Sequence, residues 1–315
     1  MLRIRMIEEG IVERYPEQQM RCPVHLSIGQ EAVAAGVCAA MEGRDYVMST
    51  HRAHAHYLAK GGDIKAMLAE LYGKAAGCSS GKGGSMHLID LDVNMLGSTP
   101  VVGGSIPVAV GTAFGSLLQG EDRVTVVFFG DAATEEGVFC ESLNFAALKQ
   151  LPLVFICENN LYSVYSPLSV RQPASRDRLA LARAHGMAAA SGDGNDVEQV
   201  FQLAREAVAR ARRGEGPTYL EFETYRWREH CGPNYDNDIG YRTEAEFAAW
   251  EKRCPIERQR TRVREEEGLS EADVSRMTTE IRREIDSAFA FAKASPLPGP
   301  AELLEGIYAP EDPLA

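Results

Sequence analysis

Residues 123–160 read RVTVVFFGDAATEEGVFCESLNFAALKQLPLVFICENN, two apolar runs separated by a longer segment of mixed character. The runs at 123–129 and 151–158 are rich in β-branched and aromatic residues and predict buried strands. Residues 136–149 between them predict a helix. Strands joined through a helix pair in parallel, with a right-handed crossover that returns the chain to the same sheet. This segment therefore predicts a strand–helix–strand unit within a parallel sheet.

The sequence on either side continues the alternation of helices and strands. Apolar and small residues predict helices over 30–41, 64–72, 107–118 and 197–213, and a further strand is expected over 218–225. Strands separated by helices of this length are typical of a three-layer α/β fold, in which a parallel sheet carries helices on both faces.

The last part of the chain predicts a helical extension. Ser270 and Asp273 form an S-x-x-D capping pattern, and apolar residues then recur at helical spacing as far as Phe289. We expect a single domain over residues 1–315 with helical extensions at both ends, the C-terminal one starting at about residue 245.

The composition narrows the class of protein. The 315 residues carry 33 basic and 45 acidic side chains, and the formal net charge of −12 argues against nucleic acid as a partner. Residues 93–120 contain no charged side chain, but their polar residues, prolines and glycines argue against a membrane-spanning helix. Seven cysteines, an odd number without a C-x-x-C pair, favour a reducing cytoplasm over a disulfide scaffold or a zinc ribbon.

Polar residues follow both strands of the central unit. Asp131 comes directly after Gly130 at the end of the first strand, and Asn160 follows the second. Ligands of open parallel sheets bind at the carboxyl ends of the strands, so the two side chains are expected at one site. Carboxylate and amide oxygens suit Mg²⁺, and a glycine-edged helix N-terminus suits a diphosphate. The alternative interpretation is structural, with Asp131 as a helix cap and Asn160 as a turn residue.

A family resemblance supports the first of these interpretations. Gly130-Asp131 followed by Asn159-Asn160 resembles the thiamine diphosphate motif. Four further blocks occur in family order around it: HLSIGQEA (25–32), THRAHAHYLAKGGD (50–63), GKGGSMH (81–87) and TYRWREH (224–230). Together they resemble the alpha subunit of the decarboxylating component of 2-oxoacid dehydrogenases, the family of pyruvate, branched-chain and acetoin dehydrogenases. The resemblance covers nearly the whole chain.

The resemblance implies roles for individual residues. It implies that Asp131, Asn160 and the carbonyl of Tyr162 coordinate Mg²⁺. It implies three catalytic histidines, His230, His25 and His54, of which the last two lie near the substrate. The residues that it implies for binding thiamine diphosphate are Arg52, Pro100, Val102, Gly130, Asp131, Ala132, Ala133, Asn160 and His230.

The activity implied is decarboxylation of a small 2-oxoacid with thiamine diphosphate and Mg²⁺, with transfer of the acyl group to a lipoyl acyltransferase. The chain matches only the diphosphate-binding module, so a beta subunit carrying the pyrimidine-binding module is expected, in an α₂β₂ assembly. Two alternatives stay open. One is a subunit of a lipoyl-independent carboligase or acyl-transferring synthase, and the other is a non-catalytic scaffold subunit.

The sequence departs from the family pattern in two places. The usual G-D-G reads G-D-A here, with Ala132 restricting the backbone beside the expected diphosphate. The usual G-H-S reads Glu229-His230-Cys231, so the serine that is phosphorylated in some relatives is absent. The acidic segment that follows, 232–242, is also unlike the usual continuation. Because this segment departs from the family pattern, both a lipoyl group and a carbonyl compound stay open as the acyl acceptor.

Three other patterns have structural interpretations that we favour. His51, His54 and His56 have spacings that allow zinc, but no neighbouring Cys or Glu completes the ligand set, which favours polar lining. Residues 77–85, GCSSGKGGS, fail the G-x-x-x-x-G-K-[ST] pattern of a nucleotide-binding loop. Cys231 has no demonstrable base nearby and is interpreted as an ordinary thiol.

The helix expected over 107–118 carries Gly111 and Gly115 four residues apart. This spacing predicts a stripe that another helix can approach closely. The approaching element is either part of the protein's own core or the expected partner subunit.

Overall fold

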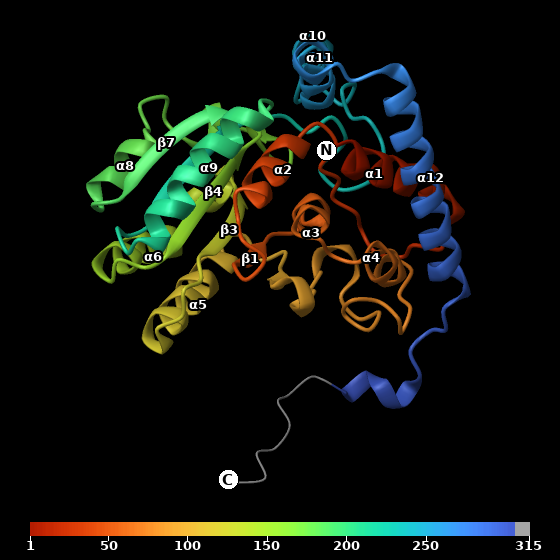
Figure 1. The fold of residues 1–315 in the computed structure, drawn as a ribbon, viewed down its shortest axis with the longest axis horizontal. Helices are drawn as coiled ribbons and strands as arrows, with labels where there is room; N and C mark the ends of the chain where they lie inside the picture. The colour runs from red at the N-terminus through yellow and green to blue at the C-terminus, as the bar shows by residue number, and fades with distance from the viewer. Residues whose placement is uncertain (306–315) are drawn as a thin grey trace.

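A six-stranded sheet forms the centre of the protein in a computed structural model that describes residues 1–305 (Figure 1). All the neighbouring strands of this sheet are parallel, in the order β2-β1-β3-β4-β8-β7. The strands are β1 (Tyr46–Ser49), β2 (Met95–Ser98), β3 (Thr125–Gly130), β4 (Leu153–Asn159), β7 (Ala188–Asp193) and β8 (Thr218–Glu223). A short hairpin, β5 (Tyr162–Ser163) and β6 (Ser166–Pro167), follows β4.

The predicted strand–helix–strand unit is present as β3, α6 (Gly137–Leu148) and β4. The strands pair in register from Thr125 opposite Leu153 to Gly130 opposite Glu158. Asp131 and Asn160, which follow these strand ends, therefore emerge at the same edge of the sheet.

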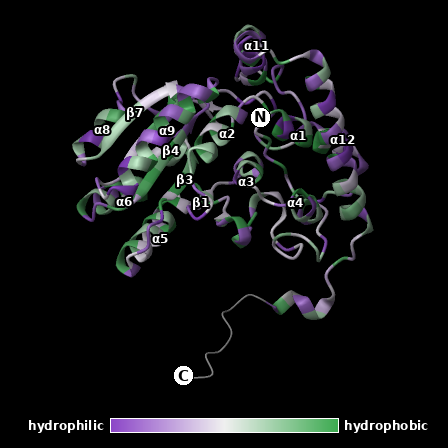
Figure 2. Ribbon diagram, viewed as in Figure 1, coloured by the Kyte–Doolittle hydropathy of each residue, from purple (hydrophilic) through white to green (hydrophobic). Residues whose placement is uncertain are grey.

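Alternating side chains of the central strands form two apolar layers. Val126 and Phe128 of β3 pack on the face covered by α2 (Glu31–Ala39) and α9 (Val197–Arg212). Val127 and Phe129 pack on the opposite face with α5 (Ser105–Gln119) and α6, which confirms the three-layer α/β fold. In Figure 2 the strands β3 and β4 are hydrophobic between these helices.

A glycine allows α2 and α9 to approach closely. A Cβ atom at Gly36 of α2 would lie 2.7 Å from Cγ1 of Val200 and 2.9 Å from the carbonyl oxygen of Val197. The small-residue composition of the segment predicted over 30–41 thus has a packing reason.

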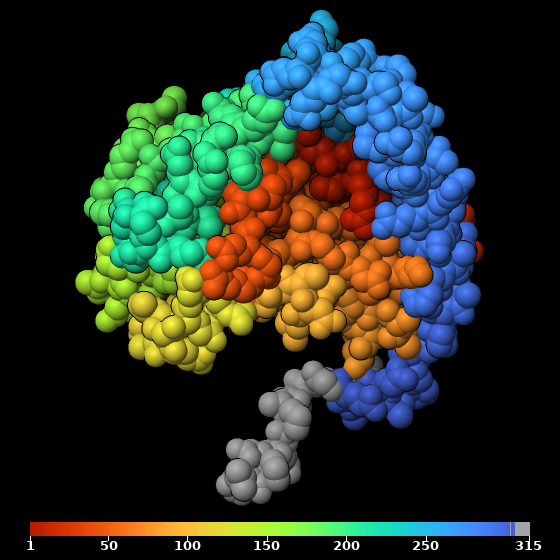
Figure 3. Space-filling view, viewed as in Figure 1, coloured from red at the N-terminus to blue at the C-terminus, as the bar shows by residue number. Residues whose placement is uncertain are grey.

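Helical segments from both ends of the chain form a layer beside the sheet. It contains α1 (Leu2–Arg14), α3 (His54–Lys60), α4 (Ile64–Leu71) and α12 (Glu271–Ala294), which packs against α1 and α4. Figures 1 and 3 show α12 along the outside of this layer. The predicted capping box is present at its first turn, where Ser270 and Asp273 bond reciprocally. Two shorter helices, α10 (Glu244–Glu251) and α11 (Pro255–Glu267), precede it, and α7 (Leu168–Arg171) and α8 (Arg178–Ala184) connect β6 to β7.

The helices and strands predicted within residues 30–225 agree with the structure to within two residues at each end, but five of the eight strands, β1, β2, β5, β6 and β7, were not predicted. Strands β1 and β2 are only four residues long. Strand β7 is made of small residues, AAASGD, which carry no β-branched or aromatic signal. The uncharged stretch 93–120 divides into β2, a loop and α5, and within residues 1–305 no helix combines the length and apolarity needed to cross a membrane.

Candidate functional site

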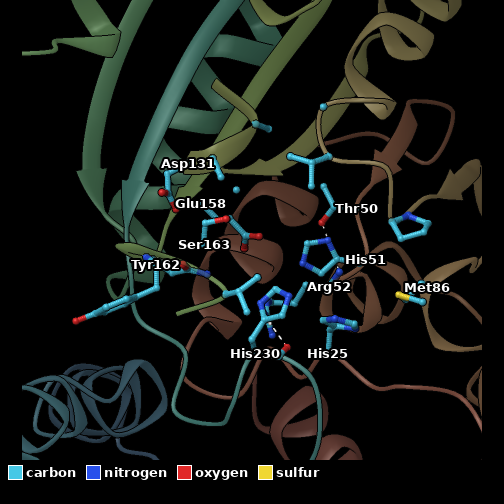
Figure 4. A pocket seen from close by; sticks show the side chains of 18 of the residues that line it. His25, Thr50, His51, Arg52, Met86, Asp131, Glu158, Tyr162, Ser163 and His230 are labelled. Atoms are coloured by element: carbon cyan, nitrogen blue, oxygen red, sulfur yellow. Dashed lines mark hydrogen bonds between the residues drawn. The ribbon is translucent and has the colours of Figure 1, made fainter. Parts of the chain in front are cut away.

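A cavity of about 190 Å³ lies at the carboxyl edge of β1, β3 and β4, where open parallel sheets bind ligands (Figure 4). Segments from most of the chain contribute to it, from residue 25 near the N-terminus to residue 230. Its lining comprises His25, Gln30, Thr50, His51, Arg52, Met86, Pro100, Val102, Gly103, Gly130, Asp131, Ala132, Ala133, Glu158, Asn160, Tyr162, Ser163, Val164 and His230.

Asp131 supplies a buried carboxylate to the cavity. It is the first residue of a 3₁₀ turn over Asp131–Glu135, and its side chain is 2% exposed. Burial raises the pKa of this carboxyl group, while an ion pair with Arg171 opposes the rise. Arg171 also pairs with Glu135, so one guanidinium lies between two carboxylates.

Asn160 and Tyr162 lie beside Asp131 on the chain that leaves β4. The Asn160 amide donates to Oε1 of Gln30 at 3.1 Å, and its own Oδ1 accepts from the backbone N–H of Tyr162 at 3.3 Å. Leu161 between them has a φ of 72°, so the chain turns sharply at this point. The Tyr162 hydroxyl donates to the carboxylate of Glu246 at 2.8 Å. This contact with a distant segment of the chain holds the turn in place.

Arg52 places a positive charge in the cavity wall. Nη1 donates to the carbonyl oxygen of Leu26 at 2.6 Å and Nη2 to that of His230 at 3.4 Å. Burial, together with the nearby Arg226, lowers the pKa of Arg52 to about 10, which leaves it protonated at neutral pH. The guanidinium is therefore an anchored cation suited to an anionic ligand.

Three imidazoles gather beside Arg52. The ring centroids of His25 and His51 are 4.7 Å apart, those of His25 and His230 are 5.0 Å apart, and those of His51 and His230 are 5.3 Å apart. Burial, with Arg52 contributing, lowers the pKa of His25 to about 2, of His51 to about 4 and of His230 to about 3. All three rings are neutral at physiological pH.

The remaining residues predicted for the cofactor also line the cavity. Pro100 and Val102 belong to the loop between β2 and α5, and the Val102 side chain is exposed. A Cβ atom added at Gly130 would meet nothing within 4 Å, so this backbone faces open space. Ala132 lies within the 3₁₀ turn at a negative φ, so the alanine of G-D-A imposes no left-handed strain there.

His54 lies outside the cavity lining, unlike the other histidines predicted to be catalytic. Its ring is fully buried, with Nε2 at 2.7 Å from the Ser85 hydroxyl and Nδ1 at 3.3 Å from a Glu8 carboxylate oxygen. The Glu8 carboxylate also accepts from the backbone N–H of Ser27 at 2.9 Å. These contacts connect His54 to the segment that carries His25.

Sequence reasoning missed several lining residues. The sequence motifs contain Glu158, Gln30 and Thr50 but assign them no role, and His51 is singled out only for the histidine spacing that allows zinc. Glu158 lies two residues before Asn160, opposite Gly130 in the register, and that pairing was the available signal. Its carboxylate lies 3.3 Å from Nε2 of His56.

The fold does not bring together His51, His54 and His56, the three histidines whose spacing along the sequence allows zinc. His54 and His56 both lie on α3, with His56 contacting Ser49 and Glu158, while His51 faces the cavity with His25 and His230. The histidines that converge thus come from three separate segments, which spacing along the sequence could not show.

The glycine-rich loop 77–85 binds a side chain of the protein itself. The Glu70 carboxylate accepts from the backbone N–H groups of Ser79 at 2.8 Å, Gly81 at 2.9 Å, Gly83 at 2.7 Å and Gly84 at 2.9 Å. These amides are the groups that would cradle a phosphate in a nucleotide-binding loop. Their use by Glu70 supports the rejection of a nucleotide site.

The divergent segment 232–242 is held by an internal ion cluster. Asp236 is 3% exposed and pairs with Arg226 at 3.4 Å and with Arg242, while Tyr241 donates to the same carboxylate. Cys231, which precedes the segment, is largely exposed, and partial desolvation together with the nearby Glu229 raises the pKa of its thiol, which is the opposite of an activated cysteine.

Comparison with known proteins identifies the family. The model of the dehydrogenase E1 component matches residues 1–301. The chain is 41% identical to the chloroplastic pyruvate dehydrogenase E1 component subunit alpha-3 of Arabidopsis thaliana, over 97% of this chain and 72% of the relative. It is 39% identical to the alpha subunit of acetoin:2,6-dichlorophenolindophenol oxidoreductase of Bacillus subtilis, over 98% and 91% respectively. For the pyruvate dehydrogenase E1 alpha subunit of Rickettsia bellii the identity is 34%, over 98% and 93%. The chain belongs to the dehydrogenase E1 component family and is an alpha subunit of a thiamine diphosphate-dependent 2-oxoacid dehydrogenase.

Proposed function

We propose that the cavity holds the diphosphate end of thiamine diphosphate together with Mg²⁺. Asp131, Asn160 and the Tyr162 carbonyl would hold the metal ion, and Arg52 and the backbone amides of Ala132 and Ala133 would face the diphosphate. The observation that carries the proposal is the convergence of Asp131, Asn160 and Arg52 on one cavity at the strand ends, from segments far apart in sequence.

The chemistry of the residues fits this pair of ligands. A carboxylate, an amide oxygen and a main-chain carbonyl form a hard-oxygen set, and Mg²⁺ characteristically completes such a set with water and phosphate oxygens. The open space beside Gly130 gives a diphosphate access to the backbone. Arg52 is held by two carbonyl oxygens and presents a guanidinium fork, which matches phosphate oxygens.

When bound, thiamine diphosphate supplies the carbon centre that allows a 2-oxoacid to lose CO₂. The protein's part is to bind, orient and exclude water. The buried surroundings of Asp131 and Arg52 strengthen their interactions with charged ligands. His25 and His230 are neutral and can accept or donate a proton at a ring nitrogen near the expected reaction centre.

A beta subunit that completes the site is the partner we propose, in an α₂β₂ assembly. Helix α5 and the loop before it expose an apolar surface that begins beside the cavity at Val102 and continues along the helix. We call it the α5 surface: Val101, Val102, Val108, Leu117 and Leu118. Added Cβ atoms at Gly111 and Gly115 meet nothing within 4 Å, so within residues 1–305 no element packs on this stripe. The structure thus favours the partner over the protein's own core as the element that approaches these glycines.

The acyl acceptor that we propose is a lipoyl group on an acyltransferase. The support is family membership, since the relatives named as pyruvate dehydrogenase E1 subunits cover nearly the whole chain. The relatives named for pyruvate make this 2-oxoacid the first substrate to test, and the relative from Bacillus subtilis, which is named for acetoin, makes that hydroxyketone the second. Release of CO₂ with lipoamide as the acceptor supports the proposal. CO₂ release that needs a carbonyl acceptor contradicts it.

Cofactor binding is tested with Asp131→Asn, which keeps the shape of the side chain and removes its charge. Thiamine diphosphate is titrated calorimetrically, in Mg²⁺, into the chain purified with its partner from its own host. We expect affinity to fall by at least about tenfold in Asp131→Asn. The control, Asp92→Asn, lies on an exposed turn and should bind as the wild type does. Equal affinity in the two variants would refute the site.

The partner surface is tested with Gly111→Leu, which places a bulky side chain on the open stripe of α5. We expect the heterotetramer in a native mass spectrum to be lost or reduced. Gly43→Leu is the matched control, because Gly43 is exposed and its added Cβ also meets nothing within 4 Å. An unchanged heterotetramer in Gly111→Leu would exclude this stripe from the interface.

A further inference from the structure

We propose that Glu8, His54 and Ser85 form a buried network that positions the substrate side of the cavity, and that His54 is a positioning residue. The inference rests on the proposed function, because the substrate side is the side away from the diphosphate that we propose beside Asp131. Figure 4 shows His25 and Met86 on that side of the cavity. The network connects the segments that carry these two residues.

The network consists of an acid, an imidazole and a hydroxyl from three separate segments. Glu8 belongs to α1, His54 begins α3, and Ser85 lies in the 3₁₀ turn Gly84–Met86. Each of the three residues is 0% exposed. Among the described residues that line the cavity, none belongs to this group. Burial of polar groups is costly unless they contact one another, so these three hold their segments in one arrangement.

The Ser85 end of the network holds one wall of the cavity. Nε2 of His54 lies 2.7 Å from the Ser85 hydroxyl oxygen. Met86, the next residue, lines the cavity, and its carbonyl accepts from the Ser98 hydroxyl at 2.9 Å. The carboxylate of Glu70 holds the two amides that precede Ser85. The contact with His54 is thus the side-chain contact that enters this turn from the protein interior.

The Glu8 end holds the opposite part of the same wall. Both carboxylate oxygens of Glu8 lie 2.9 Å from the backbone nitrogen of Ser27, whose N–H donates to them. Ser27 follows Leu26, whose carbonyl accepts from Arg52 at 2.6 Å. His25 lies one residue further back. Glu8 therefore fixes the backbone from which His25 reaches the cavity.

The two contacts of the His54 ring differ in strength. Nδ1 lies 3.3 Å from Oε1 of Glu8, in a contact that lacks hydrogen-bond geometry. Nδ1 carries a proton, since a nitrogen lone pair would repel a facing carboxylate. In the neutral ring Nε2 is then the acceptor, and the Ser85 hydroxyl donates to it. The bond with Ser85 is the stronger of the two, and its loss should matter more than the loss of the Glu8 contact.

The arrangement separates substrate fit from cofactor binding. A shift of His25 or Met86 changes the wall against which a substrate must be oriented, and small misplacements of this kind reduce productive binding. Asp131 and Asn160, which we propose for the metal ion, are carried by the strand ends on the other side and do not contact the network. We therefore expect a change in KM for the 2-oxoacid with little change in affinity for thiamine diphosphate.

Two substitutions of His54 test the two contacts separately. In His54→Gln the amide reaches the place of Nε2 and can still accept from Ser85. In His54→Asn the amide reaches only the place of Nδ1, so the contact with Ser85 is lost. Ser85→Ala removes the same bond from the other side, and its single missing oxygen keeps the test available if a His54 variant does not fold. Exposed His87, in the same loop region, supplies the control His87→Gln.

Each variant is purified with its partner from the protein's own host, and its melting temperature is recorded. CO₂ release with lipoamide is measured with pyruvate and with the 2-oxoacid that wild type decarboxylates fastest. Thiamine diphosphate is titrated calorimetrically in Mg²⁺. Hydrogen exchange of residues 81–90 and 23–30 is followed by mass spectrometry, which reports the network without any turnover.

We expect KM for the 2-oxoacid to rise at least about fivefold in His54→Asn and in Ser85→Ala, the effect of one lost hydrogen bond. In both variants kcat should stay within about twofold and cofactor affinity should equal that of wild type. His54→Gln and His87→Gln should lie close to wild type. The double variant His54→Asn/Ser85→Ala should be no worse than either single one, because all three lack the same bond. This pattern is the reverse of that expected for Asp131→Asn, so the two proposals can fail separately.

Three results would overturn the proposal. A fall in kcat at unchanged KM would place His54 in the chemical step, and a fall in cofactor affinity would place it in the cofactor site. Additive losses in the double variant would show that His54 and Ser85 act independently. If wild type releases no CO₂ from any 2-oxoacid, the proposed function fails and hydrogen exchange decides on the network. Faster exchange of residues 81–90 in His54→Asn than in His54→Gln then supports it, and equal exchange contradicts it.

Discussion

The guanidinium of Arg171 forms an ion pair with the carboxylate of Asp131, and only 10% and 2% of the two side chains are exposed. The same guanidinium pairs with Glu135. A protein cation therefore faces the carboxylate that we propose for Mg²⁺. Arg171 bonds Oδ2 of Asp131 and leaves Oδ1 for the proposed metal ion, which would then lie close to the guanidinium.

Removal of Arg171 should destabilise the metal-free protein. Arg171→Gln leaves the Asp131 carboxylate buried without its partner, and we expect a loss of about 3 kcal/mol in the free energy of unfolding. Urea denaturation in a chelator measures the loss, and added Mg²⁺ should recover part of it. Arg276→Gln, which breaks an exposed pair with Asp273, should cost less than about 1 kcal/mol. Similar losses in the two variants would mean that the Asp131 pair contributes no more than a surface pair.

The histidine cluster should make stability depend on pH. The unfolded chain protonates these imidazoles below about pH 6.5, whereas folded His25 has a pKa of about 2, so stability falls as the pH drops from 6.5 towards that value. At pH 5 the cost from His25 alone is about 2 kcal/mol. Denaturant titrations at pH 5 and pH 7.5 should show a smaller difference for His25→Gln than for wild type. His87→Gln, on the exposed loop, should retain the wild-type difference.

The loop 77–85 should depend on the charge of Glu70. Glu70→Gln replaces one carboxylate oxygen by an amide nitrogen that cannot accept, which leaves one pair of amides, either Ser79 and Gly81 or Gly83 and Gly84, without its partner. We expect a loss of about 3 kcal/mol in unfolding free energy and faster hydrogen exchange of these amides. The exposed control Glu265→Gln should change stability by less than about 0.5 kcal/mol. Unchanged exchange at all four amides, Ser79, Gly81, Gly83 and Gly84, would contradict the role of Glu70.

Two helix glycines should respond to alanine with opposite sign. Gly36→Ala puts a methyl group 2.7 Å from Val200 and should destabilise the protein by about 1–3 kcal/mol. Gly111→Ala meets no atom within 4 Å and should stabilise the chain by about 0.5–1 kcal/mol through helix propensity. Thermal and urea unfolding of the chain without its partner measure both changes. A loss of stability in Gly111→Ala would mean that other atoms of the chain pack against the α5 surface at this position.

The fold could be predicted where periodicity and composition are strong. The runs at 123–129 and 151–158 are long, apolar and β-branched, and they predict the parallel unit at the centre of the sheet. Strand β7 could not be found in this way, because its alanines and glycine have no intrinsic strand preference and pair only where β8 offers an edge.

The site could be predicted only in part, because sequence motifs name residues without saying which way they point. His51, His54 and His56 follow one another within six residues, yet the start of α3 directs them to different surroundings. The role of Arg171 could not be predicted for the same reason. Nothing in its local sequence indicates an ion pair with Asp131, which lies forty residues earlier. Side-chain convergence is a tertiary property, and here the loops between strands and helices determine it.

The position of α12 has a consequence for the order in which this chain matures during synthesis. Ile285 and Phe289 of α12 belong to the same apolar core as Ile4, Ile7 and Ile11 of α1, and Arg3 pairs with Glu284 at 2.6 Å. Helix α1 is thus completed by a helix that follows it by more than 250 residues. Until residues 271–294 emerge, the part of the apolar face of α1 that α12 covers stays exposed, although α3 and the central sheet are already synthesised. The layer that carries Glu8 and His54 therefore matures only after α12 has been synthesised, and a nascent chain stopped before α12 should depend on chaperones.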